Sequence, residues 1–295
     1  MKPIAAEEQR AAVRGVRLWT KRHGDGPPMV LLHGGPGMWD YFDELAAMLD
    51  DIVEVHRYDQ RGGGRSEDAP PYDVESFVAD LEALRCHWRH ERWIVCGHSW
   101  GANLALAYAV KHPRRVSALL LLSGTGVVDD WREEYHRSAD ARRTPEQRAR
   151  RLELRAIVKG GGDRWTPELD REYCLLTWMA DYADRDQAME YTRRLLRPYG
   201  PNHELNAALG ADLQRLCADG FGERMRRVEA PALVLHGARD PRPVRLAERQ
   251  ASMLPNARLV IVPEAGHLPW VEQAEAFRAA VRSFVAETVA IGASS

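Results

Sequence analysis

The segment Gly97-His-Ser99-Trp-Gly101 has residue types that could perform nucleophilic catalysis. It matches Gly-x-Ser-x-Gly, in which a serine sits at the sharp turn between a strand and a helix, and small neighbours are needed because the turn is tight. The pattern is short, so its context carries the argument. Residues 93–96 form an apolar run before the turn, and residues 102–110 are helix-forming. We therefore predict that Ser99 is a nucleophile.

A serine hydroxyl needs a general base, and the base needs a partner that holds its tautomer. Two candidates follow later apolar runs. Asp240 comes after residues 232–235, and His267 comes after residues 258–262. The ends of parallel strands meet at one edge of a sheet, where the serine turn also opens. We therefore predict that His267 is the base and that Asp240 orients it.

Other acids and histidines compete for these roles. Glu264 is the rival acid, but it lies only three residues before the predicted base, on the same loop. His33 and His98 are embedded in turn motifs, where we expect them to support loops. His236 lies in the strand-end segment that aims the predicted acid, so a structural role is expected there too.

Acyl transfer also requires two backbone donors that stabilise the oxyanion. The amide of Trp100, directly after the nucleophile, is predicted to be one. The other is predicted to come from His33-Gly34-Gly35-Pro36-Gly37, because glycines let the backbone approach a substrate carbonyl closely. We favour Gly35 as the donor and place Gly34 among the substrate-binding residues.

These candidates must be positioned by alternating strands and helices. Apolar runs at residues 29–32, 51–58, 93–96 and 116–122 are separated by helical patterns at 41–49, 74–88 and 102–112. Such alternation predicts an α/β architecture with a mostly parallel sheet flanked by helices. Residues 127–227 contain only helix-forming stretches, after which strand character resumes. We predict a core of residues 1–126 and 228–295, interrupted by a helical cap at 127–227.

Composition narrows the function class. The 295 residues carry a net charge of −2, which argues against nucleic-acid binding. The longest apolar run, residues 118–122, is too short to span a membrane. The first residues lack the order of a secretory signal, so a cytoplasmic location is expected. The four cysteines follow no metal-ligand spacing, and we expect buried, reduced thiols and no metal at Cys86, Cys96, Cys174 and Cys217.

Together these motifs resemble the α/β-hydrolase superfamily and, within it, the proline iminopeptidases. The resemblance rests on His33-Gly-Gly-Pro-Gly37, Asp59-Gln-Arg-Gly-Gly-Gly-Arg-Ser66 and the Ser99 turn, with Asp240 and His267 completing it. It implies an α/β-hydrolase fold and cleavage of an N-terminal residue, often proline, from a peptide or amide. It also implies that no cofactor is needed and that the partner is a small molecule or short peptide; the oligomeric state is left open.

In that family, carboxylates hold the substrate's free amine. The stretch Tyr199-Gly-Pro-Asn-His-Glu-Leu-Asn206 is similar to the family's Gly-Pro-Asn-Glu segment, which makes Glu204 the candidate amine anchor; a solvated acid at a helix start is the alternative. Many of these peptidases carry a second glutamate directly after the catalytic aspartate, and here that position is Pro241.

Cap aromatics offer a different kind of substrate contact. Trp131 and Trp178, with Trp165 and Tyr182, are expected either to line an apolar pocket or to pack between helices. The leading prediction is therefore a serine hydrolase that acts as an aminopeptidase or amidase. An esterase, lactonase or thioesterase is the alternative, and a non-catalytic ligand-binding homologue is a remote one.

Overall fold

A computed structural model describes residues 6–126, 131–160 and 164–292 of the chain. Residues 127–130, the predicted start of the cap, and residues 161–163, within its glycine-rich break, lie outside the described residues. The described residues form one eight-stranded sheet, in the order β1-β2-β4-β3-β5-β6-β7-β8. Its strands are β1 (Glu7–Val13), β2 (Val16–His23), β3 (Pro28–Leu32), β4 (Glu54–Tyr58), β5 (Trp93–His98), β6 (Val116–Leu122), β7 (Ala232–Gly237) and β8 (Ala257–Val262).

The strands from β4 to β8 across the sheet pair in parallel, and only the β1–β2 and β2–β4 pairs are antiparallel. The mostly parallel α/β sheet predicted from the apolar runs is therefore confirmed. The β1–β2 hairpin was not predicted. β1 lies at the sheet edge and has the mostly polar sequence EEQRAAV, so it lacks the continuous apolar run that marks the central strands.

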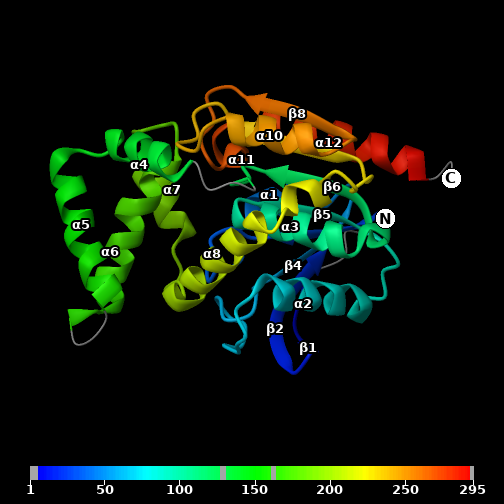
Figure 1. Ribbon diagram of the computed structural model, residues 1–295, viewed down its shortest axis with the longest axis horizontal. Helices are drawn as coiled ribbons and strands as arrows, with labels where there is room; N and C mark the ends of the chain where they lie inside the picture. The colour runs from blue at the N-terminus through cyan, green and yellow to red at the C-terminus, as the bar shows by residue number, and fades with distance from the viewer. Residues whose placement is uncertain (1–5, 127–130, 161–163, 293–295) are drawn as a thin grey trace.

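Helices cover both faces of the sheet, so the central strands are buried on both sides (Figure 1). Along β5, Trp93 and Val95 join the core beneath α2 (Val74–His87) and α3 (Trp100–Lys111), whereas Ile94 and Cys96 face the opposite core. This alternation is the two-residue period of a strand. The opposite core is closed by α1 (Asp43–Ala47), α11 (Pro269–Glu272) and α12 (Ala274–Gly292).

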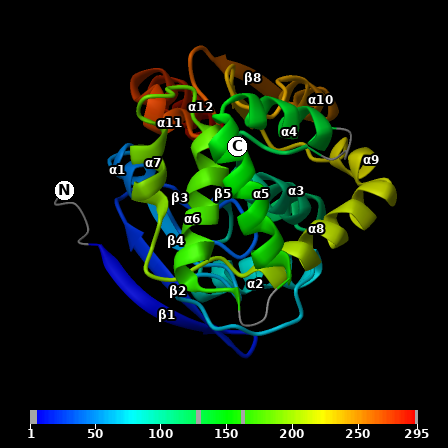
Figure 2. The ribbon, with the colours of Figure 1, turned by 90° about the vertical axis from the view of Figure 1, so that its left-hand side faces the viewer.

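The chain leaves the sheet after β6 and returns at β7. The described residues between these strands form helices without a strand, namely α4 (Arg132–Ala141), α5 (Pro145–Gly160), α6 (Pro167–Trp178), α7 (Ala188–Leu195), α8 (His203–Ala218) and α9 (Phe221–Met225). Figure 1 shows α4 to α7 together at one end of the molecule, and in Figure 2 α5 and α6 lie in front of the sheet. In contrast, Leu205, Leu209 and Phe221 pack into the core beneath α2 and α3. The last two helices of the predicted cap thus belong to the core packing.

Local signals explain where these helices begin. Thr166 caps α6 by accepting a hydrogen bond from the Leu169 amide, and Pro167 occupies the first turn. Asn202 caps α8 in the same way through the Leu205 amide. α10 (Arg245–Met253) connects β7 to β8. None of the helices among the described residues combines the length and the apolar character required to cross a bilayer.

The cysteines only partly match the expected burial. None of the four, all of which lie among the described residues, forms a disulfide; Cys96 and Cys174 are buried, whereas Cys217 is half-buried. The expectation is wrong for Cys86, which is exposed. It lies near the end of α2, whose buried residues include Leu81, Leu84 and Arg85 but not Cys86.

Candidate active site

Ser99 occupies the turn between β5 and α3 with a φ of +55°, a conformation that L-residues rarely adopt. The two glycines of the motif permit it. A Cβ on Gly97 would lie 2.1 Å from the Gly101 carbonyl oxygen, and one on Gly101 would lie 1.9 Å from the Leu32 carbonyl oxygen. The Ser99 side chain makes no capping hydrogen bond to α3, although it precedes the helix. Its hydroxyl is therefore not committed to the helix.

The loops after β7 and β8 bring the predicted acid and base together. His267 Nδ1 lies 2.6 Å from Asp240 Oδ2. The two residues are only 4% and 8% exposed, so water does not compete for this hydrogen bond. Ser99 and His267 line the same small cavity of about 120 Å³. The structure thus brings the predicted nucleophile, base and acid together at the carboxyl edge of the sheet.

Arg242 holds the other oxygen of the acid, a contact that sequence reasoning missed. Its amide donates to Asp240 Oδ1 at 2.8 Å, and its Nη1 lies 3.3 Å from the same oxygen and 2.8 Å from Asp181 Oδ1. Burial alone would raise the pKa of Asp240, but the charges of His267 and Arg242 hold that pKa below its usual value. The acid therefore stays ionised. A cationic residue two positions after the predicted acid was the available signal.

Glu264, the alternative acid, and the histidines His33 and His236 contact other residues than Ser99. The Glu264 side chain is 68% exposed and pairs with exposed Arg239 at 3.1 Å. His33 Nε2 accepts a hydrogen bond from the Gln60 amide at 3.1 Å, and His236 Nε2 lies 3.1 Å from the Arg242 carbonyl oxygen. These contacts brace loops, as expected from the sequence.

His98 joins the glycine loop to the base loop. Its Nδ1 lies 2.5 Å from the Tyr41 hydroxyl, and its Nε2 lies 2.9 Å from the His267 carbonyl oxygen. Burial and the neighbouring His267 lower the pKa of His98 well below its usual value, so the ring is neutral. A neutral ring that donates from Nε2 to the carbonyl must accept at Nδ1 from the hydroxyl. The Tyr41 oxygen in turn accepts from the Gly34 amide at 2.7 Å.

Gly34 and Gly35 differ in whether their amides already have a hydrogen-bond acceptor. The Gly34 amide is committed to Tyr41, and Gly34 lines neither cavity at the site. Gly35 has a φ of +55° and lines both cavities together with Ser99. Among the described residues, no acceptor receives a hydrogen bond from the Gly35 amide. Its amide, and that of Trp100 in the first turn of α3, remain available for a substrate oxygen.

Gln60, in the Asp59-Gln-Arg turn, joins two loops of the site by hydrogen bonds that the sequence alone did not indicate. Its Nε2 donates to the His33 carbonyl at 2.9 Å, and its Oε1 accepts from Trp100 Nε1 at 3.0 Å. Gln60 therefore ties the glycine loop to the serine turn. Asp59 holds the start of the turn by accepting from the Arg65 amide at 2.7 Å.

The base loop is also tied to the helical insertion. The His267 amide donates to the Asp181 carbonyl at 2.7 Å. Glu272 accepts from the Gly266 amide at 2.6 Å and from the Ala183 amide at 2.7 Å. The position of His267 is therefore set by the insertion as well as by the sheet.

A larger cavity of about 340 Å³ adjoins Ser99 and extends beneath the helical insertion. Trp131 and Trp178, the aromatic residues predicted to bind substrate, line it. Trp165 is 40% exposed and Tyr182 packs on Tyr191, so these two aromatics do not line it. The other aromatic and charged lining residues are Trp100, Tyr135, Tyr173, Arg132, Arg242 and His203.

No aspartate or glutamate among the described residues lines the larger cavity. Glu204, the candidate amine anchor, is exposed in the first turn of α8 and lines neither cavity. Asp181 lines the smaller cavity but is already paired with Arg242. Sequence similarity made Glu204 the candidate amine anchor, whereas the first turn of α8 leaves that position exposed to solvent.

The family described as the alpha/beta hydrolase fold matches residues 27–274. The chain belongs to the α/β-hydrolase family. It is similar to the proline iminopeptidase of Levilactobacillus brevis, with 27% identity over 88% of each chain. It is also similar to the pimeloyl-[acyl-carrier protein] methyl ester esterase of Nitrosomonas europaea, with 28% identity over 86% of this chain and 94% of the other.

Among solved structures, this α/β hydrolase resembles a mutant of the meta-cleavage product hydrolase CumD, with a TM-score of 0.73 and 22% identity over 95% of this chain and 98% of the other. That likeness concerns the fold. Relatives with peptidase and esterase names thus share one scaffold with this chain.

Proposed function

We propose that this α/β hydrolase is a serine hydrolase that works through an acyl-enzyme. His267 Nε2 takes the proton of the Ser99 hydroxyl as the oxygen attacks a substrate carbonyl. Collapse of the tetrahedral intermediate returns that proton to the leaving group. Water, activated by the same histidine, then releases the acid and restores Ser99. The hydrogen bond of 2.6 Å between His267 and Asp240 is the observation that carries this proposal, because it holds the base in the tautomer that accepts at Nε2.

The negative charge of the tetrahedral intermediate needs donors already in place. In the proposed mechanism the amides of Gly35 and Trp100 supply them, and the positive end of the α3 dipole adds to their effect. Burial of the surrounding side chains strengthens each of these interactions, because little water screens them.

For the substrate, we propose a neutral acyl ester or lactone. An ammonium group removed from water needs an anionic partner. Among the described residues the larger cavity offers none, and its charged lining groups are basic or histidine. Trp131 and Trp178 provide apolar surface suited to an uncharged acyl chain.

Aminopeptidase or amidase action is the second candidate. It is favoured by the similarity to proline iminopeptidases and by the Gly-Pro-Asn-His-Glu segment. In that case Asp181, the one carboxylate among the described residues that lines the smaller cavity, would be shared between the substrate amine and Arg242.

A substrate panel distinguishes the two candidates. We expect p-nitrophenyl acyl esters to be turned over and prolyl and alanyl p-nitroanilides to be poor substrates. A preference for the anilides would instead support the aminopeptidase. Glu204→Ala tests the amine anchor directly. A loss on aminoacyl anilides alone supports an anchor, whereas unchanged rates on both substrate classes match its exposed position.

Chemical labelling tests the acyl-enzyme itself. A fluorophosphonate should label the wild-type chain, and Ser99→Ala should abolish the label. A wild-type chain that is folded but unlabelled and inactive on the whole panel would contradict the serine hydrolase proposal and favour a ligand-binding homologue.

A further inference from the structure

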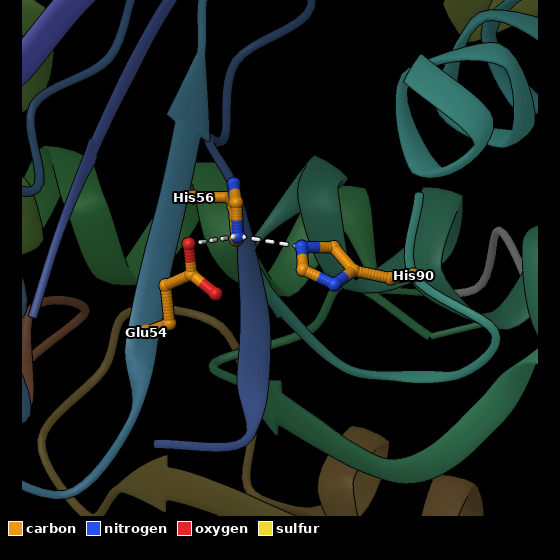
Figure 3. A group of neighbouring side chains, drawn as sticks. All are labelled: Glu54, His56 and His90. Carbon is orange, nitrogen blue, oxygen red and sulfur yellow. Dashed lines mark hydrogen bonds and ion pairs between the residues drawn. The ribbon is translucent and has the colours of Figure 1, made fainter. Parts of the chain in front are cut away.

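A second group of chemically reactive side chains lies away from Ser99. Glu54 and His56 project from β4, two residues apart and therefore on the same face of the strand. His90 follows α2, just before β5. Figure 3 shows the three side chains converging on one point, although they come from segments far apart in the sequence.

The distances within this group suit a small cation. His56 Nε2 lies 2.9 Å from His90 Nε2 and 3.5 Å from Glu54 Oε1, and the three potential ligand atoms lie within 4.8 Å of one another. Tetrahedral zinc with bonds of about 2.0–2.1 Å separates neighbouring ligand atoms by about 3.4 Å. The two rings would need to part by only about 0.5 Å, which is within ordinary side-chain adjustment.

The hydrogen bond between the rings leaves much of their capacity unused. His56 is fully buried, and its Nδ1 has no hydrogen-bond partner among the described residues.

We propose that Glu54, His56 and His90 form a binding site for one divalent transition-metal ion, best represented by Zn²⁺, with a fourth position open to water. Two imidazoles and one carboxylate are a ligand set for zinc and its neighbours in the transition series. Mg²⁺ and Ca²⁺ prefer sites made of oxygen ligands, so they should bind poorly.

The surroundings allow the side chains to turn toward an ion. Arg22 Nη1 lies 3.5 Å from Glu54 Oε1, but Arg22 also pairs with Glu7 at 2.8 Å and keeps that partner if Glu54 binds metal. The Trp88 ring packs on His56 with ring centroids 4.4 Å apart, which restrains that imidazole. A restrained ligand loses less freedom on binding the ion.

The ion would connect β4 to the segment between α2 and β5. Glu54 is the first residue of β4, whereas the serine turn lies at the carboxyl edge of the sheet. The two ends of β4 are four residue steps apart, about 13 Å along the strand. The metal site therefore does not depend on the proposed serine hydrolase function.

The test uses the tag-free, full-length chain, stripped with a chelator and titrated with ZnCl₂ by calorimetry. We expect one Zn²⁺ to bind at this site and to raise the melting temperature, with no such effect from MgCl₂. His90→Ala should weaken this binding at least 100-fold, and Glu54→Gln should weaken it at least 10-fold. Glu54 and His90 are only half-buried, so we expect these variants to fold more readily than one changed at the buried His56.

His87→Ala is the matched control, because His87 is an exposed histidine at the end of α2, three residues from His90. It should bind Zn²⁺ like the wild type. Co²⁺ should give intense tetrahedral visible bands in the wild type and in His87→Ala, but not in His90→Ala. Absence of Zn²⁺ binding by the wild type would overturn the proposal. So would unchanged affinity in His90→Ala, which would place the ion elsewhere, for example at His267.

Discussion

Tyr41→Phe isolates the contact that joins the glycine loop to the serine turn. It removes one oxygen that accepts from the Gly34 amide at 2.7 Å and lies 2.5 Å from His98 Nδ1. Burial raises the pKa of the Tyr41 hydroxyl, so in the wild type it keeps its proton and donates to the neutral His98. The substitution keeps the aromatic ring and its packing, and it changes only these two hydrogen bonds.

The expected losses of stability and activity follow from the polar groups that Tyr41→Phe leaves unpaired. The variant leaves a buried amide and a buried ring nitrogen without partners, at about 1–3 kcal/mol each, so the free energy of unfolding should fall by about 2–6 kcal/mol. Gly35 is the next residue along the chain, and its amide should shift from the oxyanion position. Complete loss of an oxyanion donor costs about 10²–10³-fold in kcat, so we expect a partial loss of about 10–100-fold.

Urea denaturation and steady-state kinetics on a p-nitrophenyl ester measure both effects. Tyr58→Phe is the matched control, because Tyr58 is also buried but its hydroxyl has no hydrogen-bond partner among the described residues. We expect Tyr58→Phe to change the free energy of unfolding by less than about 1 kcal/mol and to leave kcat unchanged. If Tyr41→Phe loses stability but keeps the wild-type kcat, the contact supports the fold alone and our reasoning about the oxyanion loop is refuted.

Three further predictions concern individual carboxylates. Asp240→Asn should lower kcat on esters by about 10³–10⁴-fold, because the histidine loses the partner that sets its tautomer; steady-state kinetics would contradict this if the loss were less than about tenfold. Glu264→Gln should leave kcat within about twofold in the same assay, because its exposed pair with Arg239 contributes little, and a loss comparable to that of Asp240→Asn would reverse the assignment of the acid. Burial raises the pKa of Asp40 to about 6, although the charge of Arg57 opposes this shift. The folded-state pKa is therefore above the unfolded value of 3.8. The contribution of Asp40 to the free energy of unfolding is then complete below about pH 4 and is lost as the pH rises through about 6. Relative to Asp40→Asn, in which Arg57 retains Asp43 at 2.9 Å, the wild type should therefore lose stability between pH 4 and 6 in urea titrations, and a pH-independent difference would contradict the shift.

Features set by short-range constraints could be predicted from the sequence. The strand runs and the glycines around Ser99 follow from strand periodicity and local sterics, and the order of serine, acid and histidine is the one typical of the α/β-hydrolase fold. The structure places Asp240 and His267 within hydrogen-bonding distance, as that order required. The β1–β2 hairpin lacked such a signal, because a polar edge strand has no apolar run to mark it.

Features set by long-range packing could not be predicted. Gln60 and Tyr41 act through partners distant in sequence, and nothing at their own positions indicates those contacts. Arg242 was overlooked because its guanidinium turns back toward Asp240 and Asp181. Glu204 was placed by a family segment, but a side chain's direction depends on helical phase, and a one-residue insertion such as His203 changes that phase by about 100°.

The hydrogen bonds between the base loop and residues 181–183 have a consequence for protein engineering. Exchanging the helical insertion with that of a relative is an obvious way to alter specificity. Here such an exchange would also replace the Asp181 carbonyl, which accepts from the His267 amide, and the Ala183 amide, which donates to Glu272. A chimera should therefore retain Asp181 to Ala183 and join the foreign helices on either side of them. Otherwise the graft would change the pocket and also misplace His267, the proposed general base.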